Sequence, residues 1–147
     1  MVNESLSLLE RFDESRTVVR LTLVRGLNMV DPEGYAKLIS GAAPMFVELK
    51  GYTWVGESQK RLPITAMPSM EELVDFGKRI AERSGYTIKL TDEKSRVVLL
   101  VRDEDAWEKN LRMVEEWRKL ERERDERVFQ LVEDFTMEEH GYRLLDY

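Results

Sequence analysis

A strand pattern, a helix pattern and a second strand pattern, in that order, constrain the fold of this sequence most. Residues 17–25, TVVRLTLVR, alternate along the chain and are rich in β-branched side chains, which predicts a strand. Residues 31–33, Asp-Pro-Glu, are typical of a helix start, and Gly41 predicts that this helix ends near residue 40. Residues 45–55 predict a second strand. This order favours a right-handed parallel βαβ unit.

A second helix and a hairpin complete the predicted sheet. Ser69 is the expected cap of a helix that ends at Gly85. Residues 86–90 and 96–101 flank a short polar connection and predict an antiparallel hairpin. Residues 3–12 predict a short amphipathic helix before the first strand. The predicted fold is α/β, a mixed sheet of about four strands made of two βαβ units that end in a hairpin.

From Asp103 onward the sequence predicts a long charged helix or a broken pair of helices. Glu121 and Arg124 interrupt its apolar stripe and predict that the middle turn lies in water. The stripe consists of Trp107, Leu111, Val114, Trp117 and Leu120 before the interruption and of Val128, Leu131 and Phe135 after it. We therefore interpret residues 1–102 as an α/β domain and residues 103–147 as its charged helical extension.

Composition excludes several kinds of site. The sequence has no cysteine and only His140 as histidine, so thiolate zinc sites, iron–sulfur clusters and multi-histidine metal sites are excluded on these residues. The net charge of −6 comes from residues 103–147, which hold 8 basic and 15 acidic side chains. No apolar run approaches a membrane span and the N-terminus lacks a signal-peptide pattern, so we expect a cytoplasmic protein.

Residues 45–68 run from an apolar strand into a long loop rich in glycine, aromatic and basic residues, and such loops are usually functional or disordered. Tyr52 and Trp54 are followed by Lys60 and Arg61, a combination that stacks unpaired bases and binds phosphates. The alternative is that Trp54, at the end of a strand, packs in the core. The sequence leaves both alternatives open.

A basic residue and a glycine stand at the end of each predicted parallel strand. Arg25 precedes Gly26 and Asn28, and Lys50 precedes Gly51. Glycine lets the backbone approach a ligand, and a nearby cation suits a carboxylate or a phosphate. The alternative is that both glycines only turn the chain. A desolvated Lys50 amine is also a candidate for a Schiff base with a keto acid.

The alternation of the two strands predicts one polar face. Arg20 shares this face with Glu48 and Lys50 of the next strand, while the intervening apolar residues point toward covering helices. One interpretation is a solvated face with an Arg20–Glu48 ion pair worth about 0–1 kcal/mol. The other is a lumen that holds a ligand.

Two long runs, RLTLVRGLNMVDPEGYAKLI and FVELKGYTWVGESQKRLPITAMPSMEEL, resemble the C-terminal half of the archaeal radical S-adenosylmethionine enzymes that make 4-demethylwyosine in tRNA. This half is known as the wyosine base formation domain, and the resemblance spans roughly residues 3–101. It implies a partial βα-barrel-like sheet whose ligands lie at the carboxyl ends of the strands. Where the family usually has a histidine before the paired acids, this sequence has Met70.

The family uses an iron–sulfur cluster and S-adenosylmethionine to join pyruvate-derived carbons to a methylated guanosine in phenylalanine tRNA. Its cluster cysteines lie in an N-terminal half, so the resemblance implies no cofactor on this chain and a cluster held by a separate subunit. Catalysis by this chain alone is not expected. The predicted substrate-binding or RNA-binding residues are Arg20, Arg25, Asn28, Glu48, Lys50, Tyr52, Trp54, Lys60 and Arg61.

The resulting hypothesis is a wyosine base formation domain that acts in tRNA modification, through tRNA binding or as an accessory of a radical S-adenosylmethionine subunit. The alternative is a non-catalytic, self-assembling structural or regulatory domain. Self-association through the sheet edge or the C-terminal helix is a further expectation, because exposed strand edges pair readily with other chains. No membrane partner is expected.

Overall fold

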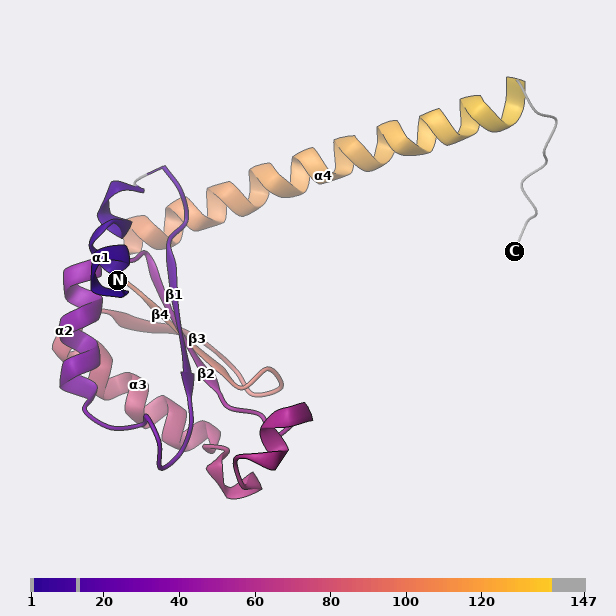
Figure 1. Cartoon of the computed structure of the whole chain (residues 1–147). Helices are drawn as coiled ribbons and strands as arrows, with labels where there is room; N and C mark the ends of the chain where they lie inside the picture. The colour runs from indigo at the N-terminus through magenta and orange to yellow at the C-terminus, as the bar shows by residue number, and fades with distance from the viewer. Residues whose placement is uncertain (1, 13, 139–147) are drawn as a thin grey trace. The chain divides into compact units, whose positions relative to one another are not determined.

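The computed structural model describes residues 2–12 and 14–138. Their contacts divide the chain into two compact units, Met1–Trp107 and Glu108–Tyr147. The first unit contains a four-stranded sheet with its covering helices, and the second contains most of one long helix (Figure 1).

The elements alternate in the predicted order. They are α1 (Val2–Ser7), the 3-10 turn η1 (Leu9–Arg11), β1 (Val18–Leu23), α2 (Pro32–Ala42), β2 (Phe46–Gly51), the 3-10 turns η2 (Gly56–Lys60) and η3 (Ile64–Ala66), α3 (Met70–Ser84), β3 (Thr87–Asp92), β4 (Val97–Val101) and α4 (Glu104–Glu138).

The sheet is mixed and open, with the strand order β1-β2-β4-β3. β1 and β2 pair in parallel and are connected by α2, which confirms the predicted first βαβ unit. β4 pairs antiparallel with both β2 and β3. The second crossover, β2-α3-β3, therefore does not place β3 next to β2. β4, the second strand of the hairpin, lies between them. The prediction of an α/β fold with a mixed sheet of about four strands is confirmed.

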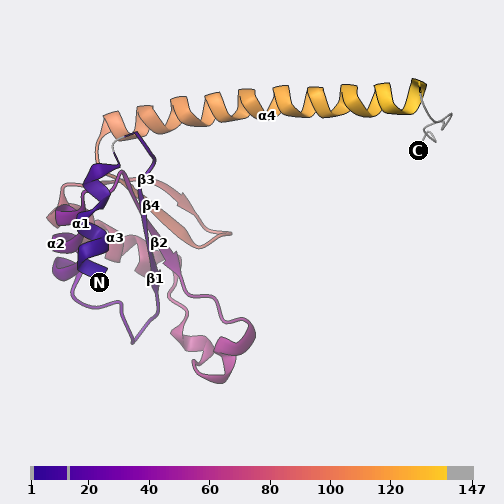
Figure 2. The same ribbon diagram turned by 45° about the horizontal axis from the view of Figure 1, so that its top comes forward.

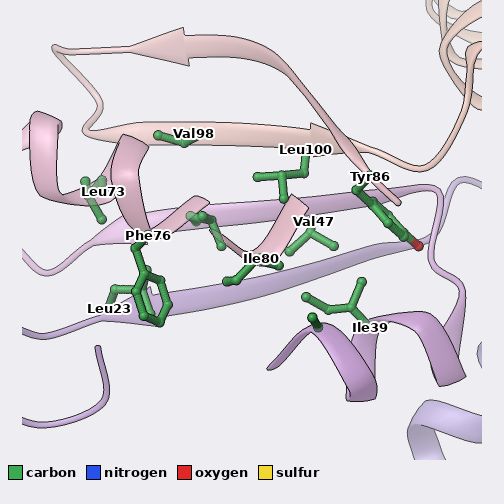
Figure 3. Close-up of a cluster of buried hydrophobic side chains, with 11 residues drawn as sticks. Leu23, Ile39, Val47, Leu73, Phe76, Ile80, Tyr86, Val98 and Leu100 are labelled. Atoms are coloured by element: carbon green, nitrogen blue, oxygen red, sulfur yellow. The ribbon is translucent and has the colours of Figure 1, made fainter. Parts of the chain in front are cut away.

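α2 and α3 cover one face of the sheet, as Figure 1 shows. Alternate residues of β1, β2 and β4 point into this layer because side chains of a strand alternate between its two faces. Figure 3 shows the resulting core, in which α3 lies across the central strands. Its buried side chains include Leu23, Val47, Leu49, Val98 and Leu100 from the strands and Ile39, Leu73, Phe76 and Ile80 from the helices.

Helix ends follow their capping residues. The Asp31 side chain accepts a hydrogen bond from the Gly34 N–H and starts α2, as predicted. α2 continues through Gly41, however, and ends where Ala43 adopts a left-handed conformation with φ 43°, so the predicted stop at Gly41 is wrong. In α3, Ser69 and Glu72 form a reciprocal capping box and Gly85 ends the helix at φ 79°.

Two other element boundaries differ from the prediction. β2 ends at Gly51 rather than at residue 55, because Tyr52 leaves the sheet and packs in a separate hydrophobic cluster formed by the loops. The N-terminal helix ends at Ser7 and continues only as a 3-10 turn. α4 is one continuous helix through Glu121 and Arg124, which decides between the two predicted alternatives for the tail. Within the described residues, no helix is long and apolar enough to cross a membrane.

Candidate functional site

The carboxyl ends of β1 and β2 meet at one edge of the sheet, since the strands are parallel and Leu23 lies beside Gly51. The loops that follow them therefore pack together (Figure 2). The Tyr52 N–H donates to the Leu23 carbonyl at 2.8 Å, and the Arg25 N–H donates to the Ala66 carbonyl at 2.9 Å. This edge is where ligands bind in sheets of this type.

The loop from residue 52 to residue 68 has a small core of its own. Tyr52 is only 8 % exposed, and Trp54 is half-buried beside it. The Tyr52 hydroxyl donates to Ser58 Oγ at 2.9 Å, and Trp54 Nε1 donates to the Leu62 carbonyl at 2.8 Å. These contacts favour the packing alternative for Trp54, and the Tyr52 ring is buried beside it.

Lys60 and Arg61 lie on the outside of the same loop. Lys60 pairs with Glu57 at 2.9 Å, but both side chains are more than 70 % exposed, so water screens this pair strongly. Among the described residues, no ion pair or side-chain hydrogen bond is formed by Arg61. The two neighbouring cations are thus presented to solvent on a loop that its aromatic residues hold in shape.

Arg25 links the end of β1 to the start of α3. Its Nε donates to Glu72 Oε1 at 2.8 Å, a second guanidinium nitrogen contacts Glu72 Oε2, and its Nη1 donates to the Thr65 carbonyl at 2.7 Å. The Arg25 hydrogen bonds and then those from Ser69 lower the pKa of Glu72 to about 2. The same contact raises the pKa of Arg25. The Arg25 guanidinium is therefore paired with Glu72 and with the Thr65 carbonyl.

Asn28 closes the turn after β1. Its Oδ1 accepts from the Val24 N–H at 2.7 Å, and its Nδ2 donates to the Thr22 carbonyl at 2.8 Å. Gly26, at φ 76°, supplies the left-handed residue that this turn needs. The contacts favour the turn alternative for this position, because both functional ends of the Asn28 side chain are used within the turn.

The polar face of the sheet carries the predicted ion pair. Arg20 and Glu48 are register partners on β1 and β2, and Arg20 Nη2 lies 2.8 Å from Glu48 Oε1. The Arg20 side chain is 60 % exposed and that of Glu48 is 19 % exposed. Within the first unit this arrangement agrees with a solvated face and a weak cross-strand pair.

Lys50, also on this face, reaches the β3–β4 hairpin. Its Nζ donates to the Ser95 carbonyl. Hydrogen bonds from Ser95 are the main cause of the lowered pKa of Asp92, and the charge of Lys50 is the smallest contribution. The Lys50 amine is therefore hydrogen-bonded at the hairpin.

The predicted residues thus divide among three places. Arg20, Glu48 and Lys50 share the polar face; Arg25 and Asn28 lie at the turn after β1; Tyr52, Trp54, Lys60 and Arg61 belong to the loop. Their roles in binding stay predictions.

Two residues that shape this edge were missed in the sequence. Glu72 does have a signal in the sequence, because Ser69-x-x-Glu72 is a capping-box pattern. Arg96 has no such signal. It adopts φ 55°, and its carbonyl accepts from the Gly51 N–H at 2.9 Å while its guanidinium donates to the Pro68 carbonyl. Arg96 therefore joins the hairpin to the end of β2.

The side chains of the described residues do not fit the ligand set of a metal cluster. The sequence contains no cysteine, and no group of three or more histidine, cysteine or acidic side chains in the described part of the chain is arranged to hold a metal ion. Iron–sulfur clusters in proteins are bound by thiolates.

The open mixed sheet, its two covering helices and the loop at its carboxyl edge define a partial βα-barrel-like domain. Residues 41–102 match the family described as wyosine base formation. These residues form a wyosine base formation domain homologous to part of the tRNA 4-demethylwyosine synthases, as the resemblance in the sequence predicted.

Relatives of known name support this assignment. The S-adenosyl-L-methionine-dependent tRNA 4-demethylwyosine synthase of Pyrococcus horikoshii is 53 % identical over 91 residues, which cover 61 % of this chain and 27 % of that protein. The enzyme of the same name from Oryza sativa is 39 % identical over 102 residues, 67 % of this chain and 16 % of that protein. The chain thus spans about a quarter of the length of the archaeal relative.

Solved structures agree in fold. A structure of TYW1 with a lysine-pyruvate adduct bound superposes with a TM-score of 0.61 at 33 % identity, over 69 % of this chain and 31 % of that one. A crystal structure of archaeal TYW1 gives a TM-score of 0.56 at 30 % identity with the same coverage. The similarity lies in the α/β fold and in part of each larger chain.

Proposed function

We propose that this chain acts in the formation of wyosine-type bases in tRNA, as a domain that contacts the tRNA substrate. The observation that carries the proposal is the 53 % identity over 91 residues to a tRNA 4-demethylwyosine synthase. The match of residues 41–102 to the wyosine base formation family agrees with it. The exposed cations Lys60 and Arg61, on a loop at the carboxyl edge of the sheet, support it. Cations that contact phosphates supply most of the affinity for a nucleic acid.

In this proposal the radical chemistry belongs to residues outside this sequence. The iron–sulfur cluster and S-adenosylmethionine are bound by a separate subunit, which this domain accompanies. Lys60, Arg61 and their neighbours on the loop then bind or position tRNA, and no residue of this chain takes part in electron transfer. We propose that the protein acts in the cytoplasm.

A gel-shift titration with unmodified phenylalanine tRNA tests the contact. We expect binding that weakens as salt increases, and the double variant Lys60→Ala/Arg61→Ala should bind roughly tenfold more weakly with a salt slope smaller by about two. Lys94→Ala, an exposed lysine in the β3–β4 hairpin, is the matched control and should bind as the unaltered chain does.

Two results would overturn the proposal. One is the absence of any tRNA shift at low salt. The other is equal weakening by the Lys94 control, which would mean a non-specific effect of charge. Co-purification with a cysteine-bearing radical S-adenosylmethionine enzyme from the same source tests the accompanying subunit separately, because it does not require free tRNA.

A further inference from the structure

The part of α4 in the second unit carries large apolar side chains that no described residue of that unit covers. Trp117 is 61 % exposed, Leu120 60 % and Val128 53 %. The family match ends at residue 102, before α4 begins, so the wyosine base formation domain does not account for this stripe. Exposed apolar side chains that share one face of a helix usually mark an interaction surface.

The spacing of this face is that of a coiled coil. Positions 110, 114, 117, 121, 124, 128 and 131 follow one another at alternating intervals of four and three residues along the uninterrupted helix of Figure 1. Such a seam faces a second helix when it is sustained over several heptads. We call these positions the seam.

Two charged residues lie in the middle of the seam. Glu121 and Arg124 occupy successive seam positions between Trp117 and Val128. Within one helix, Arg124 Nη2 donates to Asp125 Oδ1 at 3.0 Å and lies 3.9 Å from Glu121 Oε1, and the side chains of Arg124 and Glu121 are 65 % and 38 % exposed, respectively. A polar residue in a seam lowers stability but selects register and orientation. The charges therefore restrict which partner fits.

We propose that a second copy of this chain covers the seam as an antiparallel helix. When position 117 lies opposite position 128 of the partner copy, Glu121 lies opposite Arg124 and Arg124 opposite Glu121. In the same register Trp117 meets Val128, and Val114 lies level with position 131, which is a leucine in the sequence. Every charged seam residue then meets its opposite and every apolar one meets an apolar one.

The flanking charges agree with this register. Arg118 and Asp125 border the seam on the same side, and in an antiparallel pair each comes near the other residue of the partner copy. A parallel pair in register would place Glu121 against Glu121 and Arg124 against Arg124. Like charges that face each other across a seam cost several kcal/mol and act against that orientation.

Charge reversal tests the proposal in the full chain. Light scattering after gel filtration should show a dimer for the unaltered chain at about 100 µM, since dimerisation follows mass action. Arg124→Glu places a glutamate opposite Glu121 of the other copy at both contacts and should weaken the dimer at least about tenfold. The double variant Glu121→Arg/Arg124→Glu restores opposite charges at both contacts and should recover the affinity to within about threefold. Far-ultraviolet circular dichroism checks that each variant keeps its helix.

Lys119→Glu is the matched control. It changes the net charge as Arg124→Glu does, but it lies outside the seam, beside Glu123. It should leave the dissociation constant within about twofold of that of the unaltered chain. Three results would each contradict the proposal: a monomer at the highest concentration, an unaffected dimer in Arg124→Glu, or a double variant that remains a monomer.

Orientation is tested by cysteine cross-linking, because the sequence contains no native cysteine. A mixture of Arg118→Cys and Asp125→Cys chains should give a mixed disulfide dimer under mild oxidation. Val128→Cys alone should give none, since the antiparallel register keeps the two copies of position 128 far apart. A disulfide between two Val128→Cys chains would show a parallel pair and overturn the proposed orientation.

Discussion

Single residues at the carboxyl edge of the sheet have structural roles that their chemistry alone did not reveal. Arg25 was a candidate anion site from its place at a strand end, yet its guanidinium is held by Glu72 and by the Thr65 carbonyl. Glu72 also caps α3 through Ser69. One carboxylate thus connects a strand end, a loop and a helix start, so its protonation affects all three.

The pH dependence of folding follows from Glu72. Its pKa is lowered from 4.5 to about 2, mainly by Arg25, so the stabilisation is fully present above pH about 4.5 and is lost as the pH falls toward 2. Glu72→Gln should lower the free energy of unfolding at pH 7 by about 1 kcal/mol, discounted because the side chain is 40 % exposed. Urea titrations at a series of pH values measure this.

Glu71→Gln is the control for this prediction, because Glu71 is exposed in the same first turn. It should retain the decline in stability between pH 4.5 and 2, and Glu72→Gln should have a smaller decline. An unchanged pH profile in Glu72→Gln would show that the Arg25–Glu72 pair does not contribute to the stability of the fold.

At the scale of elements, the close approach of α3 to the end of β2 determines how the sheet and its helices fit. A Cβ atom at Gly51 would lie 2.8 Å from Leu73 Cδ1, and Leu73 is fully buried. Glycine at this position therefore follows from packing, in addition to the turn that begins there. Nothing in the local sequence pattern distinguishes this glycine from one that only ends a strand.

Gly51→Ala should accordingly destabilise the chain by about 1–3 kcal/mol, since the added Cβ would force the fully buried Leu73 side chain to shift. Gly41→Ala is the matched change, because a Cβ atom there meets nothing within 4 Å and the residue lies within α2. It should be neutral or stabilising by up to about 1 kcal/mol. Thermal unfolding measures the stability of both variants. Equal changes in stability would contradict the packing argument.

For the whole molecule, the division into two units predicts uneven stability. The fully buried residues of the core lie in the first unit, several of them on β2 and β4, whereas Trp117 and Val128 of the second unit are exposed until the proposed dimer covers them. Local opening costs least where few buried contacts hold an element. The two units should therefore respond differently to dilution.

Hydrogen exchange followed by mass spectrometry measures this difference. We expect amides of β2 and β4 to exchange slowest at every concentration, and amides of residues 108–130 to exchange faster when the chain is diluted below its dimerisation constant. The amides of β2 and β4 are the internal control, because their protection does not depend on a second copy. Exchange in residues 108–130 that ignores concentration would contradict the proposed pairing.

Local residue patterns alone determined much of this protein. Alternation in 18–23 and 46–51, the caps Asp31 and Ser69, and the polar connection of the hairpin specify the elements, because each acts within a few residues. They also specify the polar strand face and its Arg20–Glu48 pair, since the side-chain period of a strand is two.

Only the tertiary structure decided how these elements meet. The insertion of β4 between β2 and β3, the burial of Tyr52 and the capture of Arg25 by Glu72 join residues that are far apart in the sequence. No local pattern encodes such contacts, because their energy depends on surfaces that exist only after the sheet has formed. The candidate cations Lys60 and Arg61 remain exposed on the loop that these contacts shape.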